Sequence, residues 1–149
     1  MIHFSLPASG TRAAAAAPDV LPPISPAHYL RLRRKAAGLT IAQVADRLGN
    51  PLDRDHARAL LALLETEGSA ARHRLTLDGL RAVFPFDPDV YVQLRDDDPA
   101  THPRICRGCG CSEWDPCVRA DEAEHCAWVS RASCSVCADR DALSRAGHR

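Results

Sequence analysis

The sequence predicts a mainly α-helical protein in two parts. A small five-helix domain is expected over residues 26–95, and a metal-stabilised, cysteine-rich module with little regular structure over residues 105–138. Apolar residues recur at three- and four-residue spacing through the first part, without an alternating β pattern. All seven cysteines lie between Cys106 and Cys137. The intervening residues 96–104 contain three consecutive acids and two prolines, which favours an extended linker.

Both ends of the chain lack a clear folding pattern. Residues 1–25 are expected to be a disordered N-terminal tail, because prolines break them into short extended pieces. Residues 139–149 are expected to form a polar tail with at most one fraying helical turn. The first residues lack the basic and long apolar segments of a signal peptide, and no apolar run approaches the ~20 residues of a membrane span. We therefore expect a cytoplasmic protein that does not contact membranes.

The formal net charge of zero conceals an uneven distribution. Residues 26–95 carry eleven Lys and Arg against eight Asp and Glu, whereas residues 96–149 carry seven against ten. The first part is therefore better suited to approach a polyanion. No carboxylate pair, Cys/His/Asp arrangement or glycine-rich phosphate loop occurs outside the cysteine block, so we expect neither an enzyme nor a small-molecule substrate.

The expected helices of the first part are each bounded by a capping residue or a helix breaker. Gly38, Gly49, Gly68 and Pro85 mark helix ends. Aromatic residues are few, so Leu, Ala and Val are expected to build most of the core. The helices are expected at residues 26–37, 41–48, 53–65, 77–84 and 89–94, with Ser25, Thr40, Asp53, Thr76 and Asp87 as N-caps.

Three stretches of the first part carry a resemblance: RLRRKAAGLTIAQVADRLG, LLETEG and LTLDGLRAVFPFDPDVY. Together they resemble the lambda-repressor-like (XRE/Cro-type) helix-turn-helix family over about residues 26–95. The resemblance implies binding of double-stranded DNA, with the third helix in the major groove. It also implies an internal ion pair between Arg34 and Glu65, and a small residue, Ala45, where the second helix packs against the third.

The residues expected to contact DNA lie on the first three helices. Arg31, Arg33 and Lys35 are expected at phosphates, unless they form a solvated helix face. The third-helix region departs from the family by about seven extra residues and interleaves acids with its candidate base readers. This departure favours an alternative, a protein-interaction adaptor that no longer reads DNA. The remaining candidates for DNA contact are Thr40, Gln43, Arg54, His56 and Arg58.

The cysteine block opens and closes with CxxC pairs, Cys106/Cys109 and Cys134/Cys137. Two such turns supply the four thiolates of a closed tetrahedral zinc site, which would be structural because no coordination position stays open. An iron–sulfur cluster and disulfides are the alternatives. Disulfides would leave one of the seven thiols over. Cys111, Cys117, Cys126 and His125 are expected either to bind a second ion or to be buried without metal.

The block ICRGCGCSEWDPC…CAWV…CSVC is similar to cysteine-rich segments behind helix-turn-helix domains in bacterial and prophage proteins. This similarity suggests a bacterial origin and implies no activity. The sequence therefore leaves two functions: a transcriptional regulator that binds DNA and is stabilised by zinc, or the adaptor. In a regulator, the module could form a homodimer or sense metal or redox state.

Overall fold

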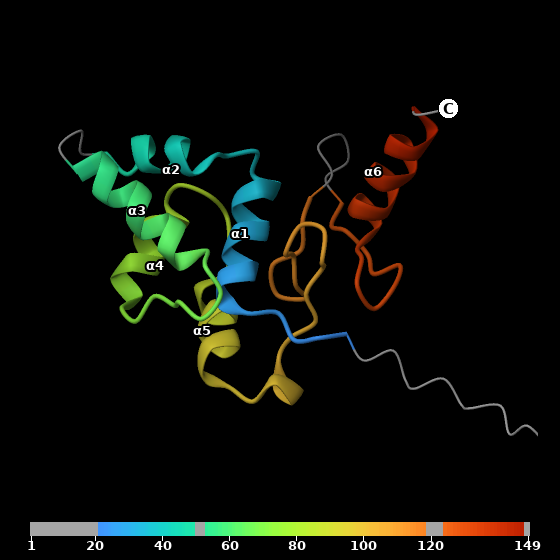
Figure 1. The fold of residues 1–149 in the computed structure, drawn as a ribbon. Helices are drawn as coiled ribbons and strands as arrows, with labels where there is room; N and C mark the ends of the chain where they lie inside the picture. Colours follow the sequence, from blue (N-terminus) through green and yellow to red (C-terminus); the bar gives the residue numbers. More distant parts are fainter. Residues whose placement is uncertain (1–20, 50–52, 119–123, 148–149) are drawn as a thin grey trace, which may run out of the picture.

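A computed structural model describes residues 21–49, 53–118 and 124–147 (Figure 1). Over these residues the protein is mainly helical, and only isolated β-bridges are present instead of strands. The helices are α1 (Pro26–Ala36), α2 (Ile41–Arg47), α3 (Arg54–Leu64), α4 (Arg74–Arg81), α5 (Pro88–Asp96) and α6 (Ser135–Ala146), with a short 3-10 helix, η2, at Pro99–Thr101. The expected fold class is confirmed in this coarse form.

The first five helices enclose an apolar core. Tyr29 of α1 and Tyr91 of α5 are fully buried within it. Each hydroxyl accepts a backbone N–H, Tyr29 from Asp87 at 3.0 Å and Tyr91 from Ala71 at 2.8 Å. These bonds satisfy the buried polar tips, so the rings contribute their full apolar area to the core. The other large buried side chains include Leu30, Val44, Leu61, Leu77, Phe84 and Val90.

Four of the predicted N-cap positions are confirmed, Asp53 of α3 by its position and the other three also by their side-chain bonds. The Ser25 hydroxyl accepts the His28 N–H at 3.0 Å, and Asp87 accepts the N–H groups of Asp89 and Val90. Thr40 forms a capping box in which its own side chain and that of Gln43 bond reciprocally to backbone N–H groups. The cap predicted at Thr76 is wrong, because α4 begins three residues earlier and its N-cap is His73.

The start of α4 has a side-chain explanation. Arg74, its first residue, donates to Asp78 one turn later at 3.2 Å and to Asp89 of α5 at 2.5 Å. These bonds hold Arg74 in the helix, although the apolar pattern begins only at Leu77. The first turn of α4 is stabilised by exposed, charged side chains. The spacing of apolar residues therefore does not predict it.

The expectation of at most one helical turn in the polar C-terminal tail is wrong over its described part. α6 runs over twelve residues, from Ser135 to Ala146. It begins inside the predicted module, because Cys134 is its N-cap and Cys137 lies in its first turn. Only Cys137 is buried along this helix. The sequence therefore shows no apolar helix face that would predict it. The cysteine pair fixes its first turn and lowers the cost of starting the helix.

The regions expected to be a tail and an extended linker are also partly folded. Ile24 is buried in the helical core, so packing begins before residue 26. The predicted tail is otherwise represented only by residues 21–25, since residues 1–20 lie outside the described ranges. In the linker, Asp98 caps η2 through its side chain. Ile105, which follows the linker, also belongs to the helical core.

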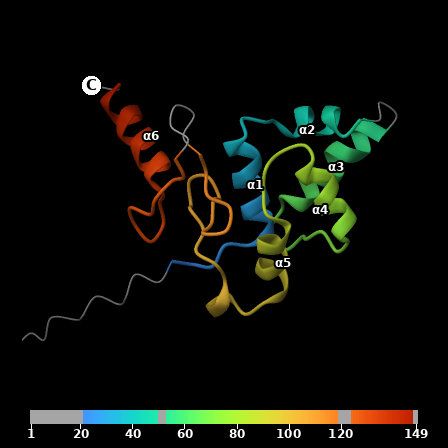
Figure 2. The same cartoon turned by 180° about the vertical axis from the view of Figure 1, so that it is seen from behind.

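The two parts of the chain meet at α1, which lies between the other helices and the cysteine loops in both views (Figures 1 and 2). Arg33 of α1 donates to the Asp115 carboxylate of the cysteine module at 2.6 Å and to the Pro85 carbonyl at 3.1 Å. Arg107 of the module also donates to the Pro22 carbonyl. The module therefore packs against the helical part, and the two parts are not separated by an extended linker.

Candidate metal centre and nucleic-acid interface

The first CxxC pair lies in a tight turn that brings its sulfurs together. The Gly110 N–H donates to the Cys106 carbonyl at 2.8 Å, and the Cys106 N–H donates to the Cys111 carbonyl at 2.9 Å. Gly110 has a φ of 77°, a left-handed conformation that a residue without a Cβ adopts readily. The turn therefore directs Cys106 and Cys109 to the same side.

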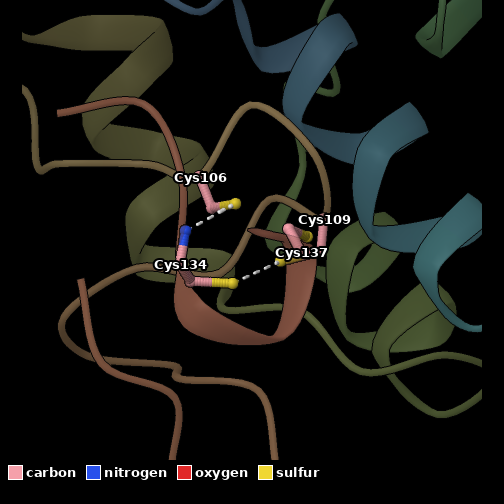
Figure 3. A group of neighbouring side chains, drawn as sticks. All are labelled: Cys106, Cys109, Cys134 and Cys137. Carbon is pink, nitrogen blue, oxygen red and sulfur yellow. Dashed lines mark hydrogen bonds between the residues drawn. The ribbon is translucent and has the colours of Figure 1, made fainter. Parts of the chain in front are cut away.

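The second CxxC pair lies at the start of α6, and Figure 3 shows it facing the first pair. Cys134 is the N-cap, and its N–H donates to the Cys106 sulfur at 3.4 Å. Ser135 is anchored by its N–H, which donates to the Ala127 carbonyl at 2.7 Å. The helix start thus presents Cys134 and Cys137 to the first turn, although the two pairs are far apart in sequence.

All four sulfurs of these pairs lie within 4.8 Å of one another, and all four residues are buried. The sulfurs of Cys109 and Cys134 are 3.8 Å apart. A zinc ion with four Zn–S bonds of ~2.3 Å requires sulfurs about 3.8 Å apart at the tetrahedron edge. The predicted outer set of Cys106, Cys109, Cys134 and Cys137 is therefore brought together in a geometry compatible with zinc or a similar soft cation.

The inner cysteines belong to the same cluster. Cys109, Cys111, Cys117 and Cys134 form a second group with sulfurs within 4.8 Å of one another. Cys126 lies outside both groups, although its sulfur is 3.7 Å from that of Cys111. His125 is exposed and belongs to neither group. It directly precedes Cys126 and pairs with Val118 in an isolated bridge.

The cluster has an electrostatic imbalance in the absence of a cation. Hydrogen bonds from the thiols of Cys109 and Cys111 hold the pKa of Cys106 well below its usual range. Donating this hydrogen bond to the Cys106 sulfur raises the pKa of Cys109. Burial is the main cause of the raised pKa values of Cys117 and Cys137. The thiols of Cys109, Cys117 and Cys137 therefore hold their protons more tightly than a free cysteine does. A cation that binds these sulfurs would displace the protons, so metal binding and thiol ionisation are coupled.

A closed site of four thiolates offers structural cross-linking and no catalysis, since no coordination position remains for water. The surrounding contacts fit this use. Arg140 donates to the Cys137 sulfur at 3.5 Å. Trp128 packs against the cysteine cluster, with the Arg104 guanidinium 4.2 Å above its ring. Trp114, by contrast, is 71% exposed.

Exposed positions of α3 carry the candidate base readers Arg54, His56 and Arg58 together with acids. Arg54 pairs with Asp46 of α2 at 2.8 Å, and Arg58 lies 3.8 Å from Asp55 on its own helix. His56 is exposed on the same helix. The structure thus brings the three predicted readers to one accessible helix. It also places a carboxylate beside each arginine.

The predicted phosphate contacts on α1 separate into different environments. Lys35 is exposed, and Arg31 is partly exposed with Glu67 at 3.9 Å. Arg33 is only 5% exposed, and Asp115 and Pro85 hold its guanidinium. This corrects the expectation that Arg33 faces solvent and phosphates. Among the other candidates, Thr40 and Gln43 are exposed and bonded to each other in the capping box of α2.

The ion pair implied for Arg34 and Glu65 is confirmed. The Arg34 guanidinium donates to both Glu65 carboxylate oxygens, at 2.6 and 2.7 Å, and to the Leu39 carbonyl at 2.6 Å. Both side chains are buried. This bidentate pair ties α1 to the C-terminal end of α3 and fixes the face of α3 that remains exposed.

Sequence reasoning missed Asp115 as the partner of Arg33. The two residues are separated by 82 positions, and no local pattern links them. Burial raises the pKa of the Asp115 carboxyl, although the nearby Arg33 acts in the opposite direction. The short contact between the guanidinium and the carboxylate nevertheless makes this pair the principal polar link between the two parts.

Comparison with known proteins assigns no family, because no family model, curated protein or solved structure matches the chain. The structure itself defines a mainly helical protein with a cysteine cluster that could bind metal. None of the described helices is both long enough and apolar enough to cross a membrane.

Proposed function

We propose that the chain is a DNA-binding transcriptional regulator whose helical part contacts duplex DNA through α3. The observation that carries this proposal is the buried Arg34–Glu65 pair. It fixes α1 against the end of α3, while Arg54, His56 and Arg58 remain accessible on α3. The major groove admits one such helix, and arginine is the commonest side chain that reads guanine.

The cysteine module has a structural role in this proposal. Its metal-bound form would hold Asp115 in position against Arg33 and thereby support α1 from the side opposite the other helices. A homodimer formed through the module would place two α3 helices about 34 Å apart, one turn of DNA. Bacterial transcription control, as the sequence resemblance implies, is the context that fits such an arrangement.

The test is fluorescence anisotropy with duplexes selected from a random pool, titrated with zinc-loaded protein at two salt concentrations. A regulator should prefer the selected duplex over a scrambled one and bind more weakly as salt rises. The double variant Arg54→Ala and Arg58→Ala should weaken binding and lower the salt slope by up to about two units. The charge-matched control replaces Arg131 of the cysteine module and Arg145 of α6 by Ala, and it should leave the affinity and the salt slope unchanged. Absence of binding at low salt would contradict the proposal.

Replacing the acids that pair with Arg54 and Arg58 should strengthen DNA binding, whereas replacing the arginines should weaken it. Asp46→Asn and Asp55→Asn release Arg54 and Arg58 from their exposed ion pairs. Such pairs are worth only ~0.2–1 kcal/mol, so each change should raise DNA affinity by up to about fivefold. Asp139→Asn on α6 is the control. If Asp46→Asn and Asp55→Asn leave the affinity unchanged, α3 is not the surface that binds DNA.

A second candidate, the protein-interaction adaptor, is favoured by a groove between α3 and α4. Its volume is about 240 Å³, and its lining is mainly apolar. Leu60 is 39% exposed there and Leu75 is 84% exposed. An adaptor should retain a co-purifying protein when Arg54 and Arg58 are replaced and lose it when Leu60→Asp and Leu75→Asp are introduced. The reverse result would contradict the adaptor.

A further inference from the structure

The two four-sulfur groups of the cysteine cluster overlap. Both contain Cys109 and Cys134, so their union comprises six of the seven cysteines. We infer that the cluster binds two divalent cations of the zinc type, bridged by the thiolates of Cys109 and Cys134. The terminal ligands are Cys106 and Cys137 on the first ion and Cys111 and Cys117 on the second.

The sulfur positions fit two tetrahedra that share an edge. The shared pair, Cys109 and Cys134, has its sulfurs 3.8 Å apart. The sulfur of Cys117 lies 3.7 Å from that of Cys134 on the second side. Both values match the edge of about 3.8 Å that four Zn–S bonds of ~2.3 Å require. The cluster therefore provides the spacing for a second ion without rearrangement of the bridging pair.

Ligand count also favours sharing. Two separate four-thiolate sites need eight cysteines, and the chain has seven. The exposed His125 does not complete a second separate site, because it belongs to neither group. Two bridging thiolates reduce the requirement to six. They also leave four positive charges facing six negative ones, a smaller imbalance than that of two separate sites with eight thiolates.

The environment of the terminal sulfurs suits the remaining negative charge. The Cys134 N–H points to the Cys106 sulfur, and Arg140 donates to the Cys137 sulfur. The second ion would add Cys111 and Cys117 to the cross-link between the first CxxC turn and α6. A core made of cysteines, with few apolar side chains around it, would thereby become a single coordinated unit.

Cys126 separates this arrangement from its strongest competitor. Its sulfur contacts that of Cys111 at 3.7 Å, but it lies outside both groups. In the competing arrangement, Cys126 would join Cys111 and Cys117 on a second ion that shares no ligand with the first. The two arrangements thus differ in whether any cysteine contacts both ions, which is directly measurable.

The deciding experiment is one- and two-dimensional NMR of the full chain reconstituted with ¹¹³Cd under reducing, anaerobic conditions. Two cadmium resonances are expected, and the Hβ protons of Cys109 and Cys134 should each correlate with both. The other four ligands should correlate with one cadmium each. A single cadmium per chain, or two cadmium ions without a shared cysteine, would overturn the inference. Protein purified with iron and acid-labile sulfide would also overturn it.

Metal analysis of two variants gives an independent answer, whether or not DNA is bound. Cys117→Ser should lower the zinc content from two ions per chain to one, because it removes a terminal ligand of the second ion only. Cys126→Ser, the matched control, should retain two. Loss of an ion from Cys126→Ser, or two ions in Cys117→Ser, would contradict the assignment. The NMR result on the unaltered chain remains decisive if a variant misfolds.

Discussion

The helical part and the cysteine module fold for different physical reasons. In the helical part, Tyr29, Tyr91 and Phe84 are fully buried among aliphatic side chains. In the module, the buried cluster consists of cysteines, and the partly buried Trp128 and Val136 pack against it. Burying apolar surface contributes ~25 cal/mol per Å² without a cofactor, whereas neighbouring thiolates repel unless a cation neutralises them. We therefore expect the first part to be stable alone and the second to depend on a bound cation.

The largest expected effect is that of metal removal. A chelator at neutral pH should unfold the module and α6, whose first turn contains Cys134 and Cys137. Structural zinc contributes ~10–16 kcal/mol in small zinc-dependent domains, so little folded module should remain. In ¹⁵N NMR spectra, residues after Ile105 should lose their dispersed signals, while the residues of α1 to α5 should retain theirs.

Readdition of metal and the behaviour of α1 to α5 test this prediction further. Readdition of zinc should restore the lost signals, whereas magnesium, which prefers oxygen ligands, should not. If α1 to α5 unfold together with the module, the contrast drawn between the two parts is wrong. The helical core would then depend on metal in the same way as the cysteine cluster.

The next effect concerns the buried Arg34–Glu65 ion pair of the helical part. Glu65→Gln leaves the Arg34 guanidinium buried without its carboxylate partner, although Arg34 can still donate to Leu39. Breaking one partner of a buried pair costs ~3–5 kcal/mol. Urea unfolding followed by circular dichroism should show this loss. The control is Glu67→Gln, whose side chain is 59% exposed and which should change stability by less than ~0.5 kcal/mol. Equal effects of the two changes would contradict a structural role for the pair.

The sequence predicts features that depend on residues close together in the chain. Ser25, Thr40 and Asp87 were identifiable as caps because a cap bonds to residues two or three positions away. Both CxxC pairs were identifiable because their spacing within a turn is itself the signal. The Arg34–Glu65 pair was accessible through the family resemblance and not through spacing.

Features that depend on contacts between distant segments escaped prediction. Arg33 resembles any basic residue of an exposed helix until Asp115, distant in sequence, is placed beside it. α6 has too little apolar pattern to indicate a helix, because its start is fixed by the cysteine cluster. The overlap of the two sulfur groups at Cys109 and Cys134 depends on how both CxxC turns meet. Composition and spacing do not contain that information.

The link between the parts has an intermediate expected effect. Arg33→Met removes the guanidinium but keeps an apolar side chain of similar length. It leaves Asp115, whose side chain is 27% exposed, without its cation. The cost for fully buried pairs is ~3–5 kcal/mol, and partial hydration should reduce it to about 1–3 kcal/mol. Thermal unfolding of zinc-loaded protein measures the loss. NMR relaxation should also show the two parts tumbling more independently.

Arg31→Met is the control for this change, since Arg31 lies on the same helix with only a 3.9 Å contact to Glu67. It should alter neither the unfolding temperature nor the coupled tumbling. If Arg33→Met behaves like Arg31→Met, the ion pair with Asp115 does not hold the two parts together. Apolar contacts around Ile105 would then be the principal link.

The smallest effect tests the packing at this boundary. A Cβ on Gly110 would lie 2.9 Å from Cδ of Arg33 and 3.1 Å from Cβ of Leu32, at a φ of 77°. Gly110→Ala should therefore destabilise the protein by about 1–2 kcal/mol through backbone strain and crowding against α1. Gly79→Ala is the matched control, because Gly79 lies within α4 and its added Cβ would meet nothing within 4 Å. That change should stabilise the protein by up to ~1 kcal/mol. Opposite signs in thermal unfolding are expected, and a neutral Gly110→Ala would mean that the module does not pack closely on α1.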